Sequence, residues 1–342
     1  MIGFDLNEEH RLLEQSVREW GAREIAPRIH DLDRAHKFDP TLLPQMAELG
    51  LLGVCVPTVY GGVGMDYISL GLASEELEYV DTSLRVILSV HVGLNCLSLL
   101  TWGTDAQKQK YLVPQAKGER IATYGLTEPA AGTDVRGLQS VAIQKKGRYL
   151  LSGEKQWISL ADVADHFLVF AWTDLEKKQQ RDPSGLTAFI VERGFKGFSS
   201  GTMKEKWGIL AGNTGYFTMD EIEVPPENVL GEPGEGFKIA MFALDQGRYT
   251  VAAGATGLIR GNSDGTRAHD GQVAATDGAD VGVRTTISDR AGGTGSRREG
   301  HRGTEGRATQ VLRPGNGLRL QGIVLHGDGL GDVGGRGVGR VT

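Results

Sequence analysis

Apolar residues recur at helical spacing through the first third of the chain. A helix is expected over residues 5–30, where Asp5 and Glu8 have the spacing of a capping box and Pro27 indicates an end or a kink. One face of this helix carries the apolar residues Leu6, Leu13, Val17 and Trp20. Further helices are expected over residues 41–49, 69–79, 82–100 and 105–113. The pattern predicts an N-terminal helical domain over residues 1–118.

The period of the apolar positions then shortens to that of β-strands. Residues 137–150 alternate around a Lys146-Gly147 turn, as the two strands of a hairpin do. Short runs rich in β-forming residues follow at residues 167–172, 186–191 and 216–224. We therefore expect a central antiparallel β-domain over residues 119–232.

A helical pattern resumes at residues 237–259 and predicts the first helix of a C-terminal helical domain, assigned to residues 233–260. The order of helical, β and helical segments predicts the α+β class.

Residues 261–342 differ from the rest of the chain in composition. About a quarter of them are glycine, and no Phe, Tyr, Trp, Met, Cys or Lys follows Tyr249. One interpretation is a natural, disordered tail, because so few large apolar groups cannot offset the ordering entropy. The other is translation out of frame, since GC-rich codons read in a wrong frame favour Gly, Arg, Ala, Val and Asp.

Composition and charge narrow the class of protein. The chain has 342 residues and a formal net charge of −6, so nothing indicates a nucleic-acid partner. Cys55 and Cys96 have no CxxC neighbour and are expected in the core of a protein from a reducing compartment. No signal-peptide pattern and no run of about 18 apolar residues is evident, which predicts a cytoplasmic protein without a membrane span.

Common cofactor and metal motifs are missing from the sequence. No GxGxxG follows a strand, no P-loop motif occurs, and the eight histidines show no metal-ligand spacing. Isolated histidines such as His91 and His166 are expected to be structural.

Several motifs in a fixed order carry the functional information. Residues 124–134 read Tyr-Gly-Leu-Thr-Glu-Pro-Ala-Ala-Gly-Thr-Asp, and residues 156–159 read Gln-Trp-Ile-Ser. Further motifs lie at residues 205–208, 224–231 and 247–254. Together they resemble the signatures of the acyl-CoA dehydrogenases over about three quarters of the chain. The resemblance implies a helical domain, a β-domain and a second helical domain, with FAD as cofactor.

The same resemblance implies a set of flavin contacts. Trp157 would lie against the isoalloxazine ring, and a flat apolar wall suits that ring. Hydroxyls of Thr127 and Ser159 and backbone groups of Tyr124 and Leu126 would meet its polar edge. The alternative for Trp157 is a buried core tryptophan.

Two further positions in the first motif are implied contacts. Gly132 would let the chain approach the cofactor, and Thr133 would contact the FAD pyrophosphate or the acyl-CoA. The alternative is an Asx-type turn at Thr133 and Asp134.

Substrate contacts are implied on two helices. Leu244, Asp245 and Arg248 resemble positions that contact acyl-CoA, although Asp245 and Arg248 also have the spacing of an ordinary helix ion pair. Arg85 and Ser89 are spaced like the pair that holds the distal carboxylate in glutaryl-CoA dehydrogenases; the alternative is a surface arginine. The stretch at residues 230–241 looks more like short- and branched-chain enzymes.

The family reaction is α,β-dehydrogenation of an acyl-CoA thioester, in fatty acid or amino acid catabolism. A glutamate removes the α-proton, and an electron-transfer flavoprotein accepts the electrons. Glu299 and Glu305, the only glutamates after Arg260, lack the flanking pattern of that base, and the Arg-x-x-Phe-Gly segment of the family is missing. We therefore assign no catalytic residue, and expect an inactive chain and loss of the family homotetramer. Alternatives are a non-catalytic acyl-CoA or partner-binding module, a glutaryl-CoA dehydrogenase and an acyl-CoA oxidase.

Overall fold

The computed structural model describes residues 5–263, which lie in one compact unit spanning residues 1–270. Residues 261–263 complete the last helix. The two interpretations of the glycine-rich segment, as a tail or as an out-of-frame product, concern residues 261–342. All but the first three of these residues lie outside the described residues.

The first part of the chain is helical, as the apolar pattern predicts. Its α- and π-helical segments are α1 (Glu8–Trp20), η1 (Gly21–Ile25), α2 (Ile29–Arg34), α3 (Leu42–Glu48), α4 (Tyr67–Val80), α5 (Thr82–Leu88), η4 (Ser89–Cys96), α6 (Leu97–Trp102), α7 (Asp105–Gln107), η5 (Lys108–Leu112) and α8 (Val113–Ala116). The turns η2 (Leu51–Gly53) and η3 (Thr58–Tyr60) connect α3 to α4. The segments η1, η4 and η5 are π-helical, so the predicted long helices contain wider turns.

The start of α1 differs from the prediction. Asn7, not Asp5, caps the helix, and its side chain accepts a hydrogen bond from the backbone N–H of His10 at 2.7 Å. The capping box therefore joins Asn7 and His10. Asparagine caps as well as aspartate does, so the cap preference could not separate the two starts. The chain turns at Pro27 before α2, in agreement with the expected break.

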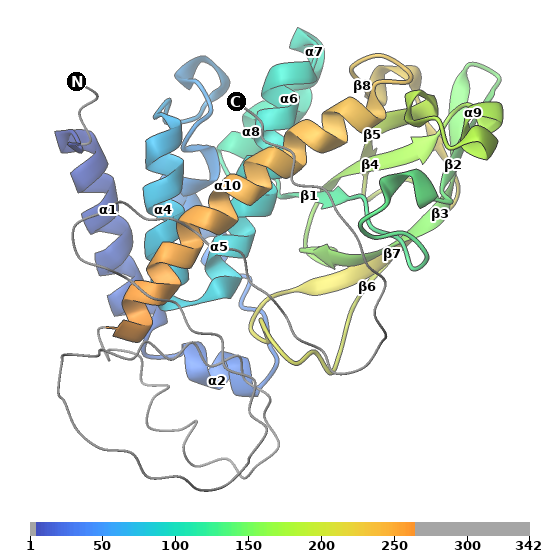
Figure 1. The fold of residues 1–342 in the computed structure, drawn as a ribbon. Coiled ribbons are helices and arrows are strands. Elements are labelled where there is room, and N and C mark those ends of the chain that lie inside the picture. Colours follow the sequence, from blue (N-terminus) through green and yellow to red (C-terminus); the bar gives the residue numbers. More distant parts are fainter. Residues whose placement is uncertain (1–4, 264–342) are drawn as a thin grey trace, which may run out of the picture. The chain divides into compact units, whose positions relative to one another are not determined.

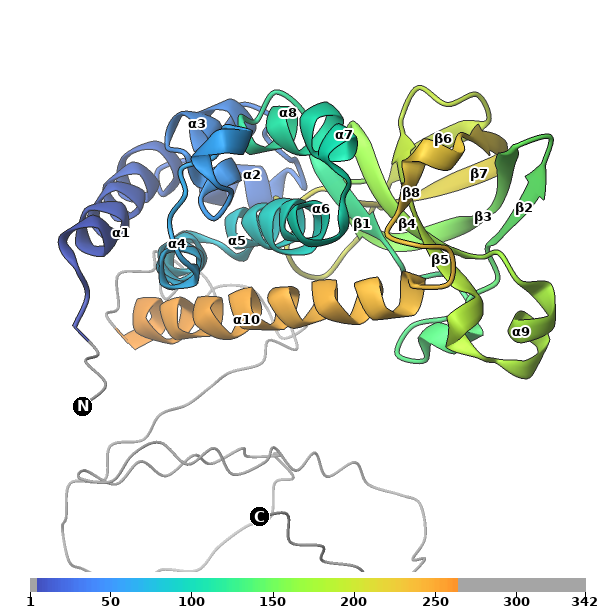
Figure 2. The same cartoon turned by 90° about the horizontal axis from the view of Figure 1, so that it is seen from above.

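The central part forms one eight-stranded sheet, on the right in Figures 1 and 2. Its strands are β1 (Ala122–Gly125), β2 (Val141–Lys145), β3 (Arg148–Ser159), β4 (His166–Trp172), β5 (Leu186–Glu192), β6 (Phe198–Thr202), β7 (Thr214–Val224) and β8 (Val229–Leu230). The strand order is β6-β7-β3-β2-β4-β5-β8, and β1 pairs with β4. The hairpin of β2 and β3 turns at Lys146 and Gly147, both with positive φ, as the sequence predicts.

A purely antiparallel sheet was the wrong expectation. Strand β1 pairs with β4 in parallel, and β2 also meets β4 in parallel through Val141 and Trp172. All four residues of β1 are buried, so the strand lacks the alternation that a half-exposed strand shows. Periodicity also does not report strand direction. The helix α9 (Leu175–Gln180) and the turns η6 (Val135–Gly137), η7 (Pro183–Gly185) and η8 (Pro226–Asn228) complete this part.

The helix α10 (Gly236–Ser263) returns from the sheet across the helical part and runs beside α4 (Figures 1 and 2). The Tyr249 hydroxyl donates to the carbonyl of Tyr67 at 2.6 Å, and Arg260 forms an ion pair with Glu75 at 2.6 Å. A Cβ at Gly257 would lie 1.9 Å from the carbonyl oxygen of Glu75, so glycine permits this close crossing. These contacts fix the C-terminal half of α10 over the helical part.

One helical stretch has the length and composition of a membrane span, contrary to the expectation from the sequence. Within the described residues, Thr82–Trp102 has a mean hydropathy of 1.6, and 72% of that stretch is buried inside the structure. Its apolar side chains, among them Leu84, Leu88 and Val92, belong to the hydrophobic core. Core burial therefore accounts for its composition.

His91 connects this buried helix to the sheet. Its Nδ1 accepts a hydrogen bond from the backbone N–H of Ala122 at 3.0 Å, which leaves Nε2 to donate to the carbonyl of Gln115 at 3.0 Å. The ring is fully buried, and burial lowers its pKa to about 4. The imidazole is therefore neutral and structural, as expected. Cys55 and Cys96 are also buried, as the sequence predicts.

We expect His91 to make the fold sensitive to mild acid. Its pKa is lower in the folded chain than the ordinary value of about 6.5, so protons bind the unfolded chain first as the pH falls. The contribution of the neutral His91 ring to the free energy of unfolding is fully present above about pH 6.5 and declines as the pH falls toward 4. Between about pH 7 and pH 5, the His91 contribution to the free energy of unfolding should fall by about 2 kcal/mol.

Urea titrations of the native chain and of His91→Gln at both pH values measure this contribution. The variant should be less stable at neutral pH but should lose about 2 kcal/mol less on acidification. Equal losses in both proteins would contradict the assignment. Because His166 also has a lowered pKa caused by burial, the comparison must be between these two proteins rather than between pH values alone.

Candidate functional site

The end of β1 and the end of β3 lie side by side and bring three of the expected flavin contacts together. The backbone N–H of Gln156 donates to the carbonyl of Thr127 at 2.9 Å. The Thr123 hydroxyl donates to the carbonyl of Ser159 at 2.5 Å. Thr127, Trp157 and Ser159 therefore lie on adjoining backbone segments, although 30 residues separate the first two in the sequence.

Trp157 points away from the core because β3 is irregular at this position. The pairing of β3 with β7 shifts register between Gln156 and Ile158, and Trp157 has φ of +61°. A bulge of this kind turns one side chain out of the alternation of the strand. The indole is 60% exposed, so the alternative of a buried core tryptophan is wrong. A left-handed backbone at a bulky residue is unusual and favours a functional reason for it.

A buried ion pair lies directly beneath these segments. Lys155 is fully buried, and its Nζ donates to Glu128 Oε1 at 2.7 Å, to the carbonyl of Phe170 at 2.8 Å and to the carbonyl of Leu126 at 3.2 Å. Glu128 also accepts from the backbone N–H of Ser140 at 3.1 Å. The pair therefore connects β3, two positions before Trp157, to β4, to the end of β1 and to the start of β2.

The pKa values of this pair follow from burial and mutual attraction. Burial raises the pKa of Glu128, but the Lys155 charge and hydrogen bonds from Lys155, Ser140 and Gln139 outweigh it, and the pKa lies below its ordinary range. Burial lowers the pKa of Lys155 despite the attraction of Glu128. The lowered pKa of Glu128 favours its charged form, and the hydrogen bonds of Lys155 to this carboxylate and to two carbonyls match the geometry of an ion pair.

The segment after Thr127 leaves the sheet as an exposed loop. Gly132 and Thr133 are exposed, and a Cβ at Gly132 would have no atom within 4 Å. Asp134 accepts from the backbone N–H of Arg136 at 3.2 Å, so the Asx-type turn expected as an alternative is present. The turn and a ligand role for Thr133 are compatible, because the turn uses only the Asp134 side chain.

The N-terminal half of α10 meets β1 at Tyr124. The buried Tyr124 hydroxyl donates to the carbonyl of Ala240 at 3.2 Å, and burial raises the pKa of this phenol. Tyr124 and Ala240 belong to one cluster of buried hydrophobic residues, and Leu244, one turn further along α10, packs against that cluster. Asp245 and Arg248 are exposed and form an ion pair at 2.6 Å. The expected helix ion pair is therefore present, at a position near Tyr124.

Arg85 and Ser89 lie inside the structure, so the alternative of a surface arginine is wrong. The Arg85 guanidinium forms an ion pair with Glu78, and both side chains are buried. Ser89 shares a hydrogen bond of 2.7 Å with the hydroxyl of Thr250 on α10. Both residues therefore already have partners where α4, α5 and α10 meet.

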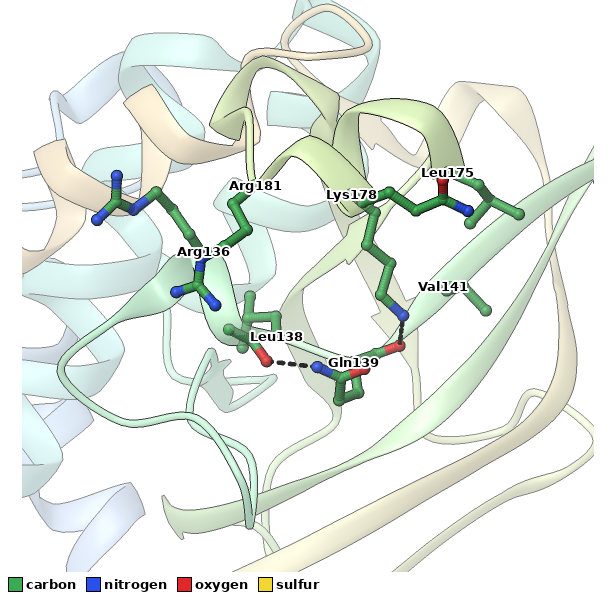
Figure 3. Close-up of a pocket in the computed structure, with 9 residues that line it drawn as sticks. Arg136, Leu138, Gln139, Val141, Leu175, Lys178 and Arg181 are labelled. Carbon is green, nitrogen blue, oxygen red and sulfur yellow. Dashed lines mark hydrogen bonds between the residues drawn. The ribbon is translucent and has the colours of Figure 1, made fainter.

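A separate cleft of about 480 Å³ lies between the segment after Asp134 and α9 (Figure 3). Arg181 and Lys178 extend from the α9 side toward residues 136–139. Lys178 Nζ donates to the carbonyl of Gln139 at 3.0 Å. No pattern in the sequence indicates this cleft, because its cationic residues come from two segments separated by the hairpin and β4.

These features can be tested against a flavin. An outward-facing indole, two neighbouring residues with hydroxyls and open space beside Gly132 fit a flat apolar ring with a polar edge and an attached phosphate chain. Among residues 5–263, no group of three His, Cys, Asp or Glu side chains could hold a metal.

Comparison with known proteins gives the family. The model of the acyl-CoA dehydrogenase N-terminal domain matches residues 7–119, and that of the acyl-CoA dehydrogenase middle domain matches residues 123–222. The chain belongs to the acyl-CoA dehydrogenase family. The resemblance found in the sequence motifs is thereby confirmed, as is the fold expected from it.

Relatives and solved structures agree. The short-chain-specific acyl-CoA dehydrogenase of Clostridium acetobutylicum is 43% identical over 269 residues, which cover 78% of this chain and 70% of the relative. Butyryl-CoA dehydrogenase from Megasphaera elsdenii has a TM-score of 0.73 at 38% identity, covering 76% of this chain and 68% of that chain. The match therefore spans about two thirds of this solved acyl-CoA dehydrogenase.

Two other structures bear on cofactor and partner. A chain in the structure reported as "Electron transferring flavoprotein of Acidaminococcus fermentans: Towards a mechanism of flavin-based electron bifurcation" has a TM-score of 0.73 at 41% identity, covering 76% of this chain and 67% of that chain. A glutaryl-CoA dehydrogenase from Mycobacterium smegmatis in complex with FADH2 has a TM-score of 0.71 at 28% identity, covering 76% of this chain and 65% of that chain. Acyl-CoA dehydrogenases are flavoproteins, and FAD is the cofactor that membership of the family indicates.

The Lys155–Glu128 pair is the main feature of this site that the sequence did not indicate. Glu128 is part of the first motif, but a buried lysine was not expected in an alternating strand. Lys155 is an even number of positions from the buried Tyr149 and Leu151, so the alternation of β3 itself places it on the buried face. The signal that could have predicted the pair is Lys155 itself, a charged residue at a buried position of a strand.

Proposed function

We propose that this chain carries the FAD- and acyl-CoA-binding part of a dehydrogenase that converts a short acyl-CoA thioester to the 2-enoyl-CoA. The observation that carries the proposal is Trp157, which the β3 bulge exposes beside Thr127 and Ser159. The relatedness to short-chain-specific and butyryl-CoA dehydrogenases supports the substrate class.

In this proposal each side chain has a binding or orienting role. The Trp157 indole forms a wall for the isoalloxazine, and the Thr127 and Ser159 hydroxyls with the backbone at Tyr124 and Leu126 bind its polar edge. Bound FAD would supply the acceptor for the β-hydrogen, which leaves as hydride. The open side of Gly132 admits the cofactor chain, and Thr133 binds its pyrophosphate or the acyl-CoA.

The acyl-CoA would lie along α10. Leu244 offers apolar contact, and Asp245 and Arg248 offer charged groups at the exposed surface of the helix. Because both charges are solvent-exposed, their mutual ion pair is weak and can yield to a ligand.

A short, neutral acyl chain fits the buried end of α10 better than a dicarboxylic one. We keep Arg85 and Ser89 as proposed contacts of a distal carboxylate. However, Glu78 already compensates the Arg85 charge, and Thr250 already binds the Ser89 hydroxyl. A second buried carboxylate would have to displace or share these partners at a cost in desolvation. The rates at which butyryl-CoA and glutaryl-CoA bind to the flavin-loaded protein compare the short neutral acyl chain with the dicarboxylic one.

The expected partners follow from the same proposal. An electron-transfer flavoprotein would accept the electrons, and the structure that includes such a flavoprotein supports this choice. We also keep the cytoplasmic location and a family homotetramer as proposals, with the tetramer weakened in this chain by the missing Arg-x-x-Phe-Gly segment.

Replacement of Trp157 by alanine tests the placement of the flavin. We expect the dissociation constant for FAD to rise by about tenfold or more, which corresponds to about 1.4 kcal/mol. The melting temperature without FAD should change little, because the indole is largely exposed. Quenching of FAD fluorescence on titration with protein measures the affinity.

Trp157→Phe is the matched control, since it retains a planar apolar face. It should bind FAD within about threefold of the native chain, a difference below 1 kcal/mol. An unchanged affinity in Trp157→Ala would place the flavin elsewhere. Binding of FAD with no spectral response to butyryl-CoA would leave a flavoprotein without the proposed substrate.

A further inference from the structure

The cleft beside α9 has the charge and size of a site for an organic phosphate. Its cationic side chains are Arg136, Lys178 and Arg181, and no acidic residue of the described chain lines it. Its volume of about 480 Å³ lies in the range of small-molecule sites and exceeds what a single phosphate needs. Leu138 and Leu175 add apolar surface on either side.

The cations are held in place from both walls. Asp134 forms ion pairs with both guanidinium groups, with Arg136 at 3.3 Å and with Arg181. Arg136 belongs to the loop after the first motif, and Arg181 ends α9 in the left-handed conformation with φ of +56°. One carboxylate shared by two arginines leaves an excess of positive charge. Two guanidinium groups with an adjacent ammonium suit phosphate, because arginine can bind it through two parallel hydrogen bonds.

The cleft also adjoins the proposed acyl-CoA path. Asp134 directly follows Thr133, which the proposed function assigns to a pyrophosphate or to acyl-CoA. A ligand that passes Thr133 toward solvent can therefore place a terminal phosphate beside Arg136 and Arg181. The acyl end would still lie toward Leu244, because Tyr124 at the start of the first motif contacts Ala240 on the same helix.

We propose that Arg136, Arg181 and Lys178 bind the phosphate monoester on the ribose of the CoA nucleotide and select it against thioesters that lack this group. The inference rests on the proposed function, since it assigns a role within acyl-CoA binding. Free adenosine phosphates share the same chemistry, and the experiment separates them from CoA.

Calorimetric titrations of the full chain loaded with FAD test the proposal. The ligands are butyryl-CoA, butyryl-dephospho-CoA, which lacks the ribose phosphate, and adenosine 3′,5′-bisphosphate. At low ionic strength the native chain should bind butyryl-CoA about tenfold more tightly than the dephospho form, and added salt should reduce this ratio. In Arg136→Gln/Arg181→Gln this preference for butyryl-CoA should fall from about tenfold to between about onefold and threefold. Lys178→Gln should lower it by a smaller factor.

Lys177→Gln is the charge-matched control, because Lys177 lies on α9 and does not line the cleft. It should keep the native ratio. FAD affinity should stay unchanged in all four proteins, and circular dichroism should show that each is folded. The proposal is wrong if native chain and double variant show the same ratio, or if the double variant loses FAD rather than discrimination between the two thioesters.

Failure of the proposed function would look different. In that case neither thioester binds, and adenosine 3′,5′-bisphosphate alone reports on the cleft. Arginine-dependent binding of this nucleotide would then retain the phosphate site while refuting the acyl-CoA path. Absence of binding for all three ligands would overturn both proposals.

Discussion

Replacement of Lys155 by methionine should lower the free energy of unfolding by about 3–5 kcal/mol, the largest stability loss that we expect from a single substitution in this chain. The variant leaves Glu128 buried without its cation, and it removes the donor to the carbonyls of Leu126 and Phe170. Methionine fills much of the same volume, so the loss reports the charge and hydrogen bonds rather than a cavity. Urea denaturation followed by circular dichroism measures it.

The double variant Lys155→Met/Glu128→Gln separates pairing from packing. The amide of Gln at position 128 is neutral and keeps one oxygen, which can accept one of the two backbone N–H groups that Glu128 binds, those of Gln139 and Ser140. The double variant should therefore recover part of the loss. We also expect weaker FAD binding in the single variant, because the pair ties together the strand ends that carry Thr127 and Trp157. A single variant within about 1 kcal/mol of the native chain would show that the pair has no important structural role.

No measurable acyl-CoA dehydrogenation is expected from a preparation of this 342-residue chain. The family places its base in a segment for which this sequence offers no matching glutamate, and removal of a positioned base costs about 10²–10⁴ in rate. Butyryl-, isovaleryl- and glutaryl-CoA with an artificial electron acceptor provide the assay. Bleaching of FAD absorbance under anaerobic conditions gives a second readout that needs no acceptor.

The outcome is informative only if the protein is shown by mass spectrometry to carry this exact sequence. The short-chain-specific dehydrogenase of Clostridium acetobutylicum is a suitable positive control in the same assay. Turnover or flavin reduction by this chain would contradict the prediction and would require a base within the sequence as it stands. Consumption of oxygen without an acceptor would favour the oxidase alternative.

The sequence by itself was enough for the longer helices, the hairpin and the family, but not for β1, β6, β8 or α9. Apolar residues at helical spacing predicted α3, α4, α10 and the long buried helix from Thr82 onward, because a helix buries one face whatever it packs against. The Lys146-Gly147 turn predicted its hairpin, because both positions need positive φ and glycine permits it. Short motifs predicted the family, because ligand contacts constrain residue types at fixed places.

Only the tertiary structure decided which of these residues meet and which way they face. The bulge of β3 at Trp157 exposed its indole, and no period in the sequence reports a bulge in advance. Lys155 follows the alternation of β3, and its burial is possible because Glu128 and two backbone carbonyls, distant in sequence, pair with it. The parallel pairing of β1 with β4 depends on how the chain crosses from the helical part. Arginine is usually a surface residue, but Arg85 is enclosed by its ion-pair partner Glu78 and by α10, which crosses it at Gly254. The physical reason is common to all these cases: burial and pairing of a polar side chain depend on partners distant in sequence, whereas periodicity records only neighbours along the chain.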